Sequence, residues 1–109
     1  MNYYIKRILP SILFLSIIFS DVTIKGIISH IDTDEPLIGA NVFIAETYQG
    51  DASDVDGAYL IDNIKTCSNC QYTLKVLYIG FEEYTTTFKA TSEKEIILNL
   101  DLTPTSLEV

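Results

Sequence analysis

Apolar and polar side chains alternate over several short runs of this chain, and this pattern constrains the fold more than any other feature. In Tyr72–Tyr78 the even positions are apolar, and mostly polar residues lie between them. The same alternation appears in Lys94–Leu102, with Ile97 as an exception, and more briefly in Ala40–Ile44 and Tyr84–Phe88. A period of two is typical of half-buried β-strands. Since no window beyond residue 20 has an amphipathic helical stripe, the pattern predicts an all-β chain.

Two further strands are expected, at Val22–Ser29 and at Ala58–Ile61. The alternation of the first slips at Gly26–Ile27–Ile28, which predicts a β-bulge there. Turn residues separate the runs, with an Asx-type turn and a proline at Asp32–Pro36 and an Asp-x-Asp-Gly turn at Asp54–Gly57. About six or seven short strands in one domain predict an antiparallel β-sandwich or a small barrel.

The start of the chain differs from the rest. Lys6–Arg7 precede the apolar run Ile8–Phe19. A basic segment followed by an apolar run of this length predicts a signal peptide at residues 1–20, and the run is too short to span a bilayer, which takes about 20 residues. We therefore expect an exported protein, with one folded domain at residues 21–102 and a linker at residues 103–109.

The mature part expected after export is strongly acidic. The whole sequence has 15 acidic residues against 7 lysines and arginines, and its net charge is −8. Without residues 1–20 all 15 acids remain with five lysines, which makes the net charge −10. Nucleic-acid phosphates and anionic headgroups are bound through clustered Lys and Arg. The composition therefore excludes nucleic-acid binding.

Cys67 and Cys70 form a C-x-x-C motif between two of the expected strands. A redox-active dithiol normally has its first cysteine at a helix N-terminus, and no helix is expected here. A zinc site needs further ligands, and His30 is the only histidine. In an exported protein we favour a disulfide between Cys67 and Cys70 that closes a hairpin loop. Redox activity and metal binding with a partner chain are the alternatives.

The turn at Gly57 contains acidic side chains that partly match a calcium loop. Aligned on Gly57, the oxygen ligands are Asp54 and Asp56, but Ala52 takes the first ligand position and Asn63 the last. We expect these aspartates to form the turn, and weak calcium binding at Asp54 and Asp56 is the alternative.

No catalytic constellation can be assembled from the sequence. The carboxylates needed for glycoside hydrolysis would have to come from Asp32, Asp34 and Glu35, which share one tight turn. No serine lies in a nucleophile elbow, and no Gly-rich phosphate loop occurs. The aromatic residues of the mature part fall mostly within expected strands, which favours the core over a sugar-stacking surface. We expect a non-catalytic protein without a cofactor or a metal.

Short motifs follow one another along the chain: Gly26–Ile28, Glu35–Val42, Gly50, Ser53–Tyr59 and Tyr78–Phe81. In this order they resemble the carboxypeptidase-regulatory-like domain that precedes the plug of many TonB-dependent outer-membrane receptors, including SusC-like importers. The resemblance covers Val22–Leu102 and implies a transthyretin-like Greek-key β-sandwich of seven antiparallel strands. The Cys67–Cys70 loop departs from the family pattern, which has a plain glycine-containing turn there.

The resemblance also implies a function. It implies a non-catalytic docking domain at the periplasmic face of the outer membrane, which serves the uptake of a nutrient such as a glycan. Its partners would be the plug and barrel of the receptor and a surface lipoprotein. Ser106–Val109 is similar to the segment that leads into the plug, so we expect the N-terminal piece of a longer receptor. The alternative is a free-standing secreted or periplasmic β-sandwich that binds carbohydrate or protein.

Gly39, Gly57 and Gly80 are expected at structural turns. Gly57 and Gly80 lie where a strand ends and a positive φ is easiest, and Gly39 precedes a strand and lets the chain turn sharply after Pro36. We expect Gly57→Val to lower the free energy of unfolding by about 1–3 kcal/mol through turn strain alone.

Overall fold

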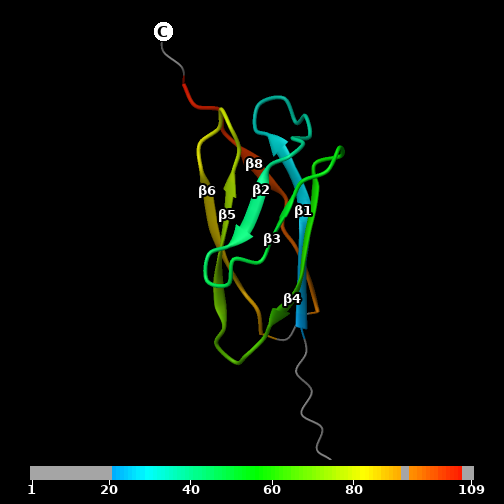
Figure 1. The fold of residues 1–109 in the computed structure, drawn as a ribbon, viewed down its shortest axis with the longest axis vertical. Coiled ribbons are helices and arrows are strands. Elements are labelled where there is room, and N and C mark those ends of the chain that lie inside the picture. Colours follow the sequence, from blue (N-terminus) through cyan, green and yellow to red (C-terminus); the bar gives the residue numbers. More distant parts are fainter. Residues whose placement is uncertain (1–20, 92–93, 107–109) are drawn as a thin grey trace, which may run out of the picture.

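Two β-sheets pack face to face in the computed structural model, which describes residues 21–91 and 94–106 (Figure 1). One sheet contains β1 (Asp21–His30), β4 (Ala58–Lys65), β7 (Glu95–Ile97) and β8 (Leu100–Leu102). The other contains β2 (Asn41–Ile44), β3 (Gly50–Ala52), β5 (Gln71–Leu77) and β6 (Tyr84–Lys89). The all-β sandwich is confirmed, with eight strands rather than seven. The described residues include no helix suited to crossing a membrane.

Two of the expected segments lie wholly or partly outside the described residues. The signal peptide predicted at residues 1–20 is one, and residues 107–109 of the predicted linker are the other.

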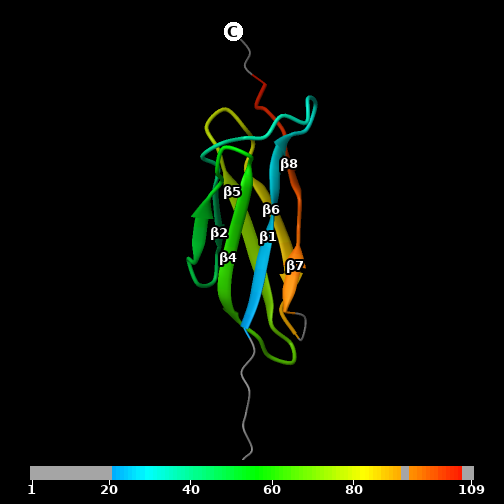
Figure 2. The same cartoon turned by 90° about the vertical axis from the view of Figure 1, so that its right-hand side faces the viewer.

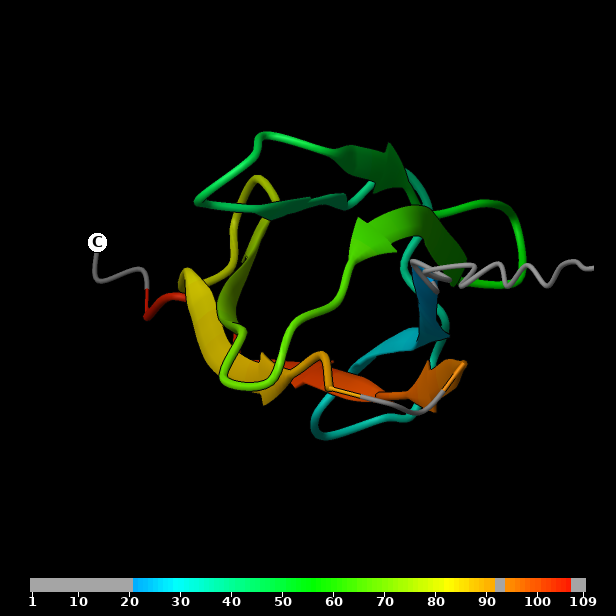
Figure 3. The same cartoon turned by 90° about the horizontal axis from the view of Figure 1, so that it is seen from below.

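The central strand of the first sheet is β1. It pairs antiparallel with β4 on one side, and on the other it pairs parallel with β7 and then with β8. This sheet is therefore mixed rather than purely antiparallel as expected. The second sheet has the order β3-β2-β5-β6, and all its neighbours are antiparallel. Figure 2 shows β1 between β4 and β7, and Figure 3 shows the strands arranged around the interior.

The last expected strand is divided into β7 and β8 by a break at Leu98 and Asn99. The break lies beside Gly26 of β1, where the Leu98 N–H donates to the Lys25 carbonyl at 2.8 Å. The side-chain Oδ1 of Asn99 then accepts the Ile27 N–H at 2.9 Å. A side-chain acceptor thus replaces one bond of the parallel ladder, and regular pairing resumes in β8.

The bulge lies in β4 rather than at Gly26. The register of β1 against β4 shifts between Val22 and Ile24, so two residues of β4 oppose Thr23. One of these two is Asn63, which has a φ of 58°. Asparagine tolerates this left-handed conformation better than most residues, and such a conformation is typical of a bulge. Gly26 itself stays in the regular register.

The core consists of the inward-facing side chains of both sheets. Tyr59 and Phe88 are buried, and Tyr72, Tyr78 and Tyr84 are partly buried against the same cluster. Burial raises the pKa of the Tyr59 phenol, and the nearby Tyr84 adds to the effect. The largest fully buried side chains are Ile24, Ile28, Ile44, Ile64, Leu74, Leu102, Val22, Val42 and Val76.

Ser53 is a buried polar residue that follows β3. Its hydroxyl donates to the Leu37 carbonyl at 2.6 Å and accepts the Ala40 N–H at 2.8 Å. Its backbone N–H donates to the Ala40 carbonyl at 2.9 Å, and its carbonyl accepts the Gly39 N–H at 2.8 Å. Ser53 therefore holds the segment that leads into β2.

We expect Ser53→Ala to lower the free energy of unfolding by about 2 kcal/mol, because the buried N–H of Ala40 and carbonyl of Leu37 would each lose a partner. Urea denaturation followed by circular dichroism measures the loss. The control is Ser68→Ala, at an exposed loop position, where the change should stay within about 0.5 kcal/mol. Equal stability of the two variants would contradict the assigned role of the Ser53 hydroxyl.

Candidate interaction surface

An open groove of about 460 Å³ lies on the outer face of the sheet formed by β4, β1 and β7. Leu60 of β4 and Ile97 of β7 both lie opposite Lys25 of β1, and Ile27 lines the groove beside them. The exposed fractions of Ile27, Leu60 and Ile97 are 39%, 46% and 61%. Apolar side chains gathered on one exposed face mark a surface suited to binding another molecule.

Acidic side chains border this apolar floor. Asp51 and Asp54 line the groove on the β4 side. The lysine of the floor, Lys25, is paired with Glu95, with 3.0 Å between Nζ and the carboxylate oxygen. Since the positive charge is already paired, the border attracts cations. The groove is therefore complementary to a partner that presents apolar and basic side chains together.

The same acidic side chains close the outer edge of β4. The Asp54 carboxylate accepts the Ala58 N–H at 2.9 Å, and the Asp51 carboxylate accepts the Leu60 N–H at 2.9 Å. Further along, the Gln49 side-chain amide donates to two carbonyls beside the bulge at 3.1 and 3.2 Å. An edge whose backbone groups are taken by side chains is protected against pairing with a further strand.

Asp54 and Gly57 form the tight turn before β4. The Asp54 carboxylate accepts the Asp56 N–H at 2.9 Å, and the Gly57 N–H donates to the Asp54 carbonyl at 2.8 Å. Within residues 21–91 and 94–106, no group of three or more His, Cys, Asp or Glu side chains is arranged to hold a metal ion. The predicted turn glycines have positive φ values of 84°, 78° and 88°, at Gly39, Gly57 and Gly80.

His30, Asp32, Asp34 and Glu35 lie at the turn after β1. The Nδ1 of His30 accepts the Asp32 N–H at 3.1 Å, and its ring packs edge-on against Phe81 with 5.3 Å between centroids. The backbone of His30 bonds to both Asp34 and Glu35 at 2.9 Å. These contacts shape the turn.

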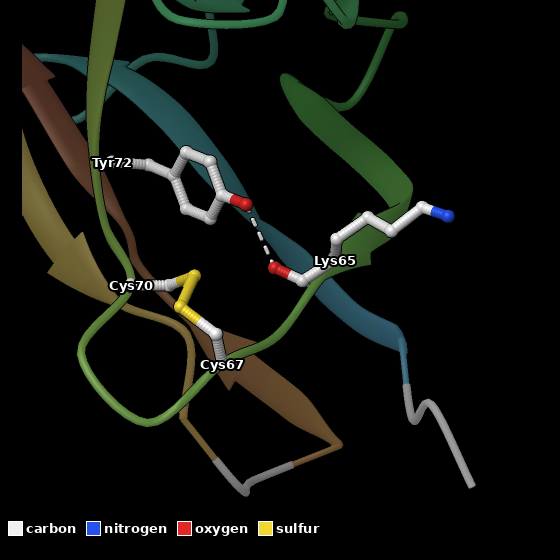
Figure 4. The surroundings of a disulfide bond; sticks show 4 residues. All are labelled: Lys65, Cys67, Cys70 and Tyr72. Carbon is white, nitrogen blue, oxygen red and sulfur yellow. Dashed lines mark hydrogen bonds between the residues drawn. A yellow bond between two sulfur atoms is a disulfide. The ribbon is translucent and has the colours of Figure 1, made fainter. Parts of the chain in front are cut away.

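A disulfide joins Cys67 and Cys70 in the loop between β4 and β5 (Figure 4). The Cys67 N–H donates to the Ala90 carbonyl at 3.3 Å, and the Ala90 N–H donates to the Cys70 carbonyl at 3.0 Å. The Tyr72 hydroxyl donates to the Lys65 carbonyl at 2.8 Å across the same loop. The disulfide therefore closes a loop that is tied both to the end of β4 and to the residue after β6.

Reduction of the disulfide should lower the free energy of unfolding by about 2 kcal/mol, the chain-entropy value for so short a loop. Urea denaturation with and without a reductant measures the difference. The control is the double variant Cys67→Ser/Cys70→Ser, which should be as unstable as the reduced protein and insensitive to the reductant. A native protein that the reductant leaves equally stable would contradict the expectation.

The segment after β8 stays attached to the sandwich. The Glu82 N–H donates to the Thr103 carbonyl at 2.8 Å, and the Thr105 N–H donates to the Gly80 carbonyl at 2.9 Å. The Thr105 hydroxyl reaches the same carbonyl at 3.2 Å. The first residues of the predicted linker are thus held against the Gly80 turn at the upper end of the domain (Figure 1).

Solved structures of several other proteins have similar folds. The Bacillus anthracis TIE protein matches with a TM-score of 0.62 and 15% identity, over 78% of this chain and 17% of that one. GBS52, the minor pilin of Streptococcus agalactiae, matches with a TM-score of 0.54 and 14% identity, over 85% and 48%. A type II cohesin–X-dockerin complex from Acetivibrio cellulolyticus matches with a TM-score of 0.54 and 20% identity, over 72% and 52%. At such identities the likeness concerns the fold alone, and this chain spans about half or less of each matched chain.

No curated protein matches the chain. The family comparison matches residues 24–109 to the CarboxypepD_reg-like domain, a range that includes all eight strands except the start of β1. This match confirms the family indicated by the order of the sequence motifs. The chain belongs to the CarboxypepD_reg-like domain family.

Proposed function

We propose that this chain is a non-catalytic docking domain of a TonB-dependent outer-membrane receptor, placed at its N-terminus on the periplasmic side and serving the uptake of a nutrient such as a glycan. The observation that carries the proposal is the family match over residues 24–109. It is supported by the resemblance of the ordered motifs to the domain that precedes the receptor plug.

The groove is the surface through which this domain docks. Its apolar floor at Ile27, Leu60 and Ile97 supplies affinity, because covering exposed apolar area is favourable by roughly 25 cal/mol per Å². Its border at Asp51 and Asp54 orients a partner segment that carries lysine or arginine. The partner is the plug and barrel of the same receptor or a surface lipoprotein bound to it.

The first test is the reading frame that encodes the chain. Continuation beyond Val109 into a plug and a barrel is the expected result. A stop codon directly after Val109, together with binding of the purified chain on a glycan array, would overturn the receptor assignment in favour of the free-standing carbohydrate-binding protein.

The second test addresses the groove in the intact receptor. Ile97→Asp should abolish cross-linking between the domain and its partner and should reduce nutrient uptake, because it places a charged carboxylate on the apolar floor of the groove. The matched control is Ile38→Asp, since Ile38 is similarly exposed, at 54% against 61%, and does not line the groove. Equal cross-linking by both variants would show that docking uses another face.

A further inference from the structure

The sheet edge at β6 is built differently from the closed edge at β4. In an antiparallel ladder the directly bonded pairs alternate along the strand. The Ala90 N–H donates to the Cys70 carbonyl at 3.0 Å, so the bonded pairs between β5 and β6 are those of even number. The odd residues of β6 direct their backbone N–H and C=O groups away from the sheet; they are Thr85, Thr87 and Lys89.

These outward backbone groups are unpaired within the described part of the chain. β6 is the last strand of its sheet, and no hydrogen bond joins the backbone of Thr85, Thr87 or Lys89 to a strand on that side. The described segment after β8 pairs only with the residues before β6, where the Glu82 N–H donates to the Thr103 carbonyl at 2.8 Å. Their side chains are exposed as well. Such a row of free donors and acceptors is a template for an added strand, and threonine is well suited to strand positions.

The charges at the two ends of β6 indicate what the added strand is. Glu83 precedes the strand and shares a face with Thr85, since the Thr85 hydroxyl lies 3.5 Å from its carboxylate. The same carboxylate lies 3.6 Å from the Lys75 Nζ, in an exposed ion pair of small stabilising effect that leaves it accessible to a second cation. Lys89 ends the strand. A strand with an acidic start and a basic end is complementary to itself when two copies run antiparallel, because opposite charges then face each other at both ends.

We propose that β6 pairs with β6 of a second copy of this chain around a two-fold axis, which joins two four-stranded sheets into one continuous sheet. In the pairing register, Thr85 of each copy lies opposite Thr87 of the other, and Glu83 of each copy lies opposite Lys89 of the other. A register shifted by two residues would lose both opposite-charge pairs, so the charges select this one.

The association is weak and reversible. Pairing along one short strand covers less than the roughly 1,200 Å² typical of stable interfaces, and the net charge of −8 on each copy opposes it. It is therefore expected at high local concentration, as when several copies are held at one membrane surface. The pairing of β6 with β6 does not depend on the proposed function of this chain as a receptor domain.

Sedimentation equilibrium of the purified chain, from micromolar to millimolar concentration, tests the proposal. A monomer–dimer equilibrium is expected. Glu83→Lys alone and Lys89→Glu alone should each weaken the dimer roughly tenfold, since each places like charges opposite each other twice. The double variant should restore the native affinity. The controls Glu35→Lys and Lys65→Glu change the net charge equally, away from β6, and should shift the affinity far less.

Amide hydrogen exchange gives a second measurement on the native chain. The N–H groups of Thr85 and Thr87 should exchange more slowly as concentration rises, while that of Thr86, already directed toward β5, should not change. A chain that stays monomeric over the whole range overturns the proposal. So does a dimer that the charge reversals leave unaffected, or one that the double variant fails to restore.

Discussion

Gly57→Val should lower the free energy of unfolding by about 3–5 kcal/mol, the largest effect expected of any substitution considered for this chain. Gly57 has a φ of 78°. A Cβ at this position would lie 2.6 Å from the Ile28 carbonyl oxygen and 3.0 Å from the Cβ of Pro36. The cost of the left-handed backbone and the cost of the steric collision add together. The loss therefore exceeds the 1–3 kcal/mol expected from turn strain alone.

The other two turn glycines separate these contributions. Gly39 and Gly80 have φ values of 84° and 88°, but a Cβ at either would meet no atom within 4 Å. Valine at either position should therefore cost only the backbone strain, about 1–2 kcal/mol. Urea denaturation of the three variants measures the comparison. If Gly57→Val lost no more stability than Gly39→Val, the contact with Ile28 would have no part in the effect.

Gly26→Ala should lower the free energy of unfolding by about 3 kcal/mol for a different reason. Gly26 does not have a positive φ, but an added Cβ would collide with the Leu98 carbonyl oxygen. That carbonyl accepts the Tyr59 hydroxyl at 2.7 Å, and the Leu98 N–H is bonded to Lys25 at 2.8 Å. Because both bonds hold the peptide in place, it cannot move aside cheaply.

A double-mutant cycle with Tyr59→Phe tests this explanation. Without the Tyr59 hydroxyl, the peptide at Leu98 has one restraint fewer, so Gly26→Ala should cost less in the Tyr59→Phe background than in the native one. Unfolding free energies of the four proteins give the coupling. Additive losses would mean that the Tyr59 bond does not hold the carbonyl against Gly26.

The alternation of side chains is sufficient to predict the all-β class and most of the strands, because it reflects which face of each strand is buried. It does not predict β3, whose three residues are all exposed and show no apolar face. It could not predict the parallel pairing of β1 with β7 and β8, which joins the two ends of the chain. Nor could it predict the break at Leu98, since the cause is a close approach to Gly26. The bulge expected at Gly26 lies in β4 instead, because a local slip in the pattern does not show which of two paired strands carries the extra residue.

Two residues that break the alternation of apolar and polar side chains line the candidate surface. Ile27 interrupted the pattern of one expected strand and Ile97 that of another, and both face the groove with Leu60. An apolar residue at a position that should be polar therefore marked an exposed surface here rather than an irregular strand. No sequence pattern indicated that Ser53 is buried and hydrogen-bonded, because its partners Leu37 and Ala40 are distant in the sequence.

The parallel pairing of the first and last strands has a mechanical consequence. β1 begins at the lower end of the domain, and the segment after β8 leaves at the upper end (Figure 1). Tension between Asp21 and Ser106 therefore pulls β1 and β8 past each other along their length. In this shear geometry the ladder bonds on that side of β1 bear the load together instead of opening one after another, as the bonds of a hairpin pulled at its open end would. A load along the axis of β1 is therefore opposed by bonds that lie across the pulling direction.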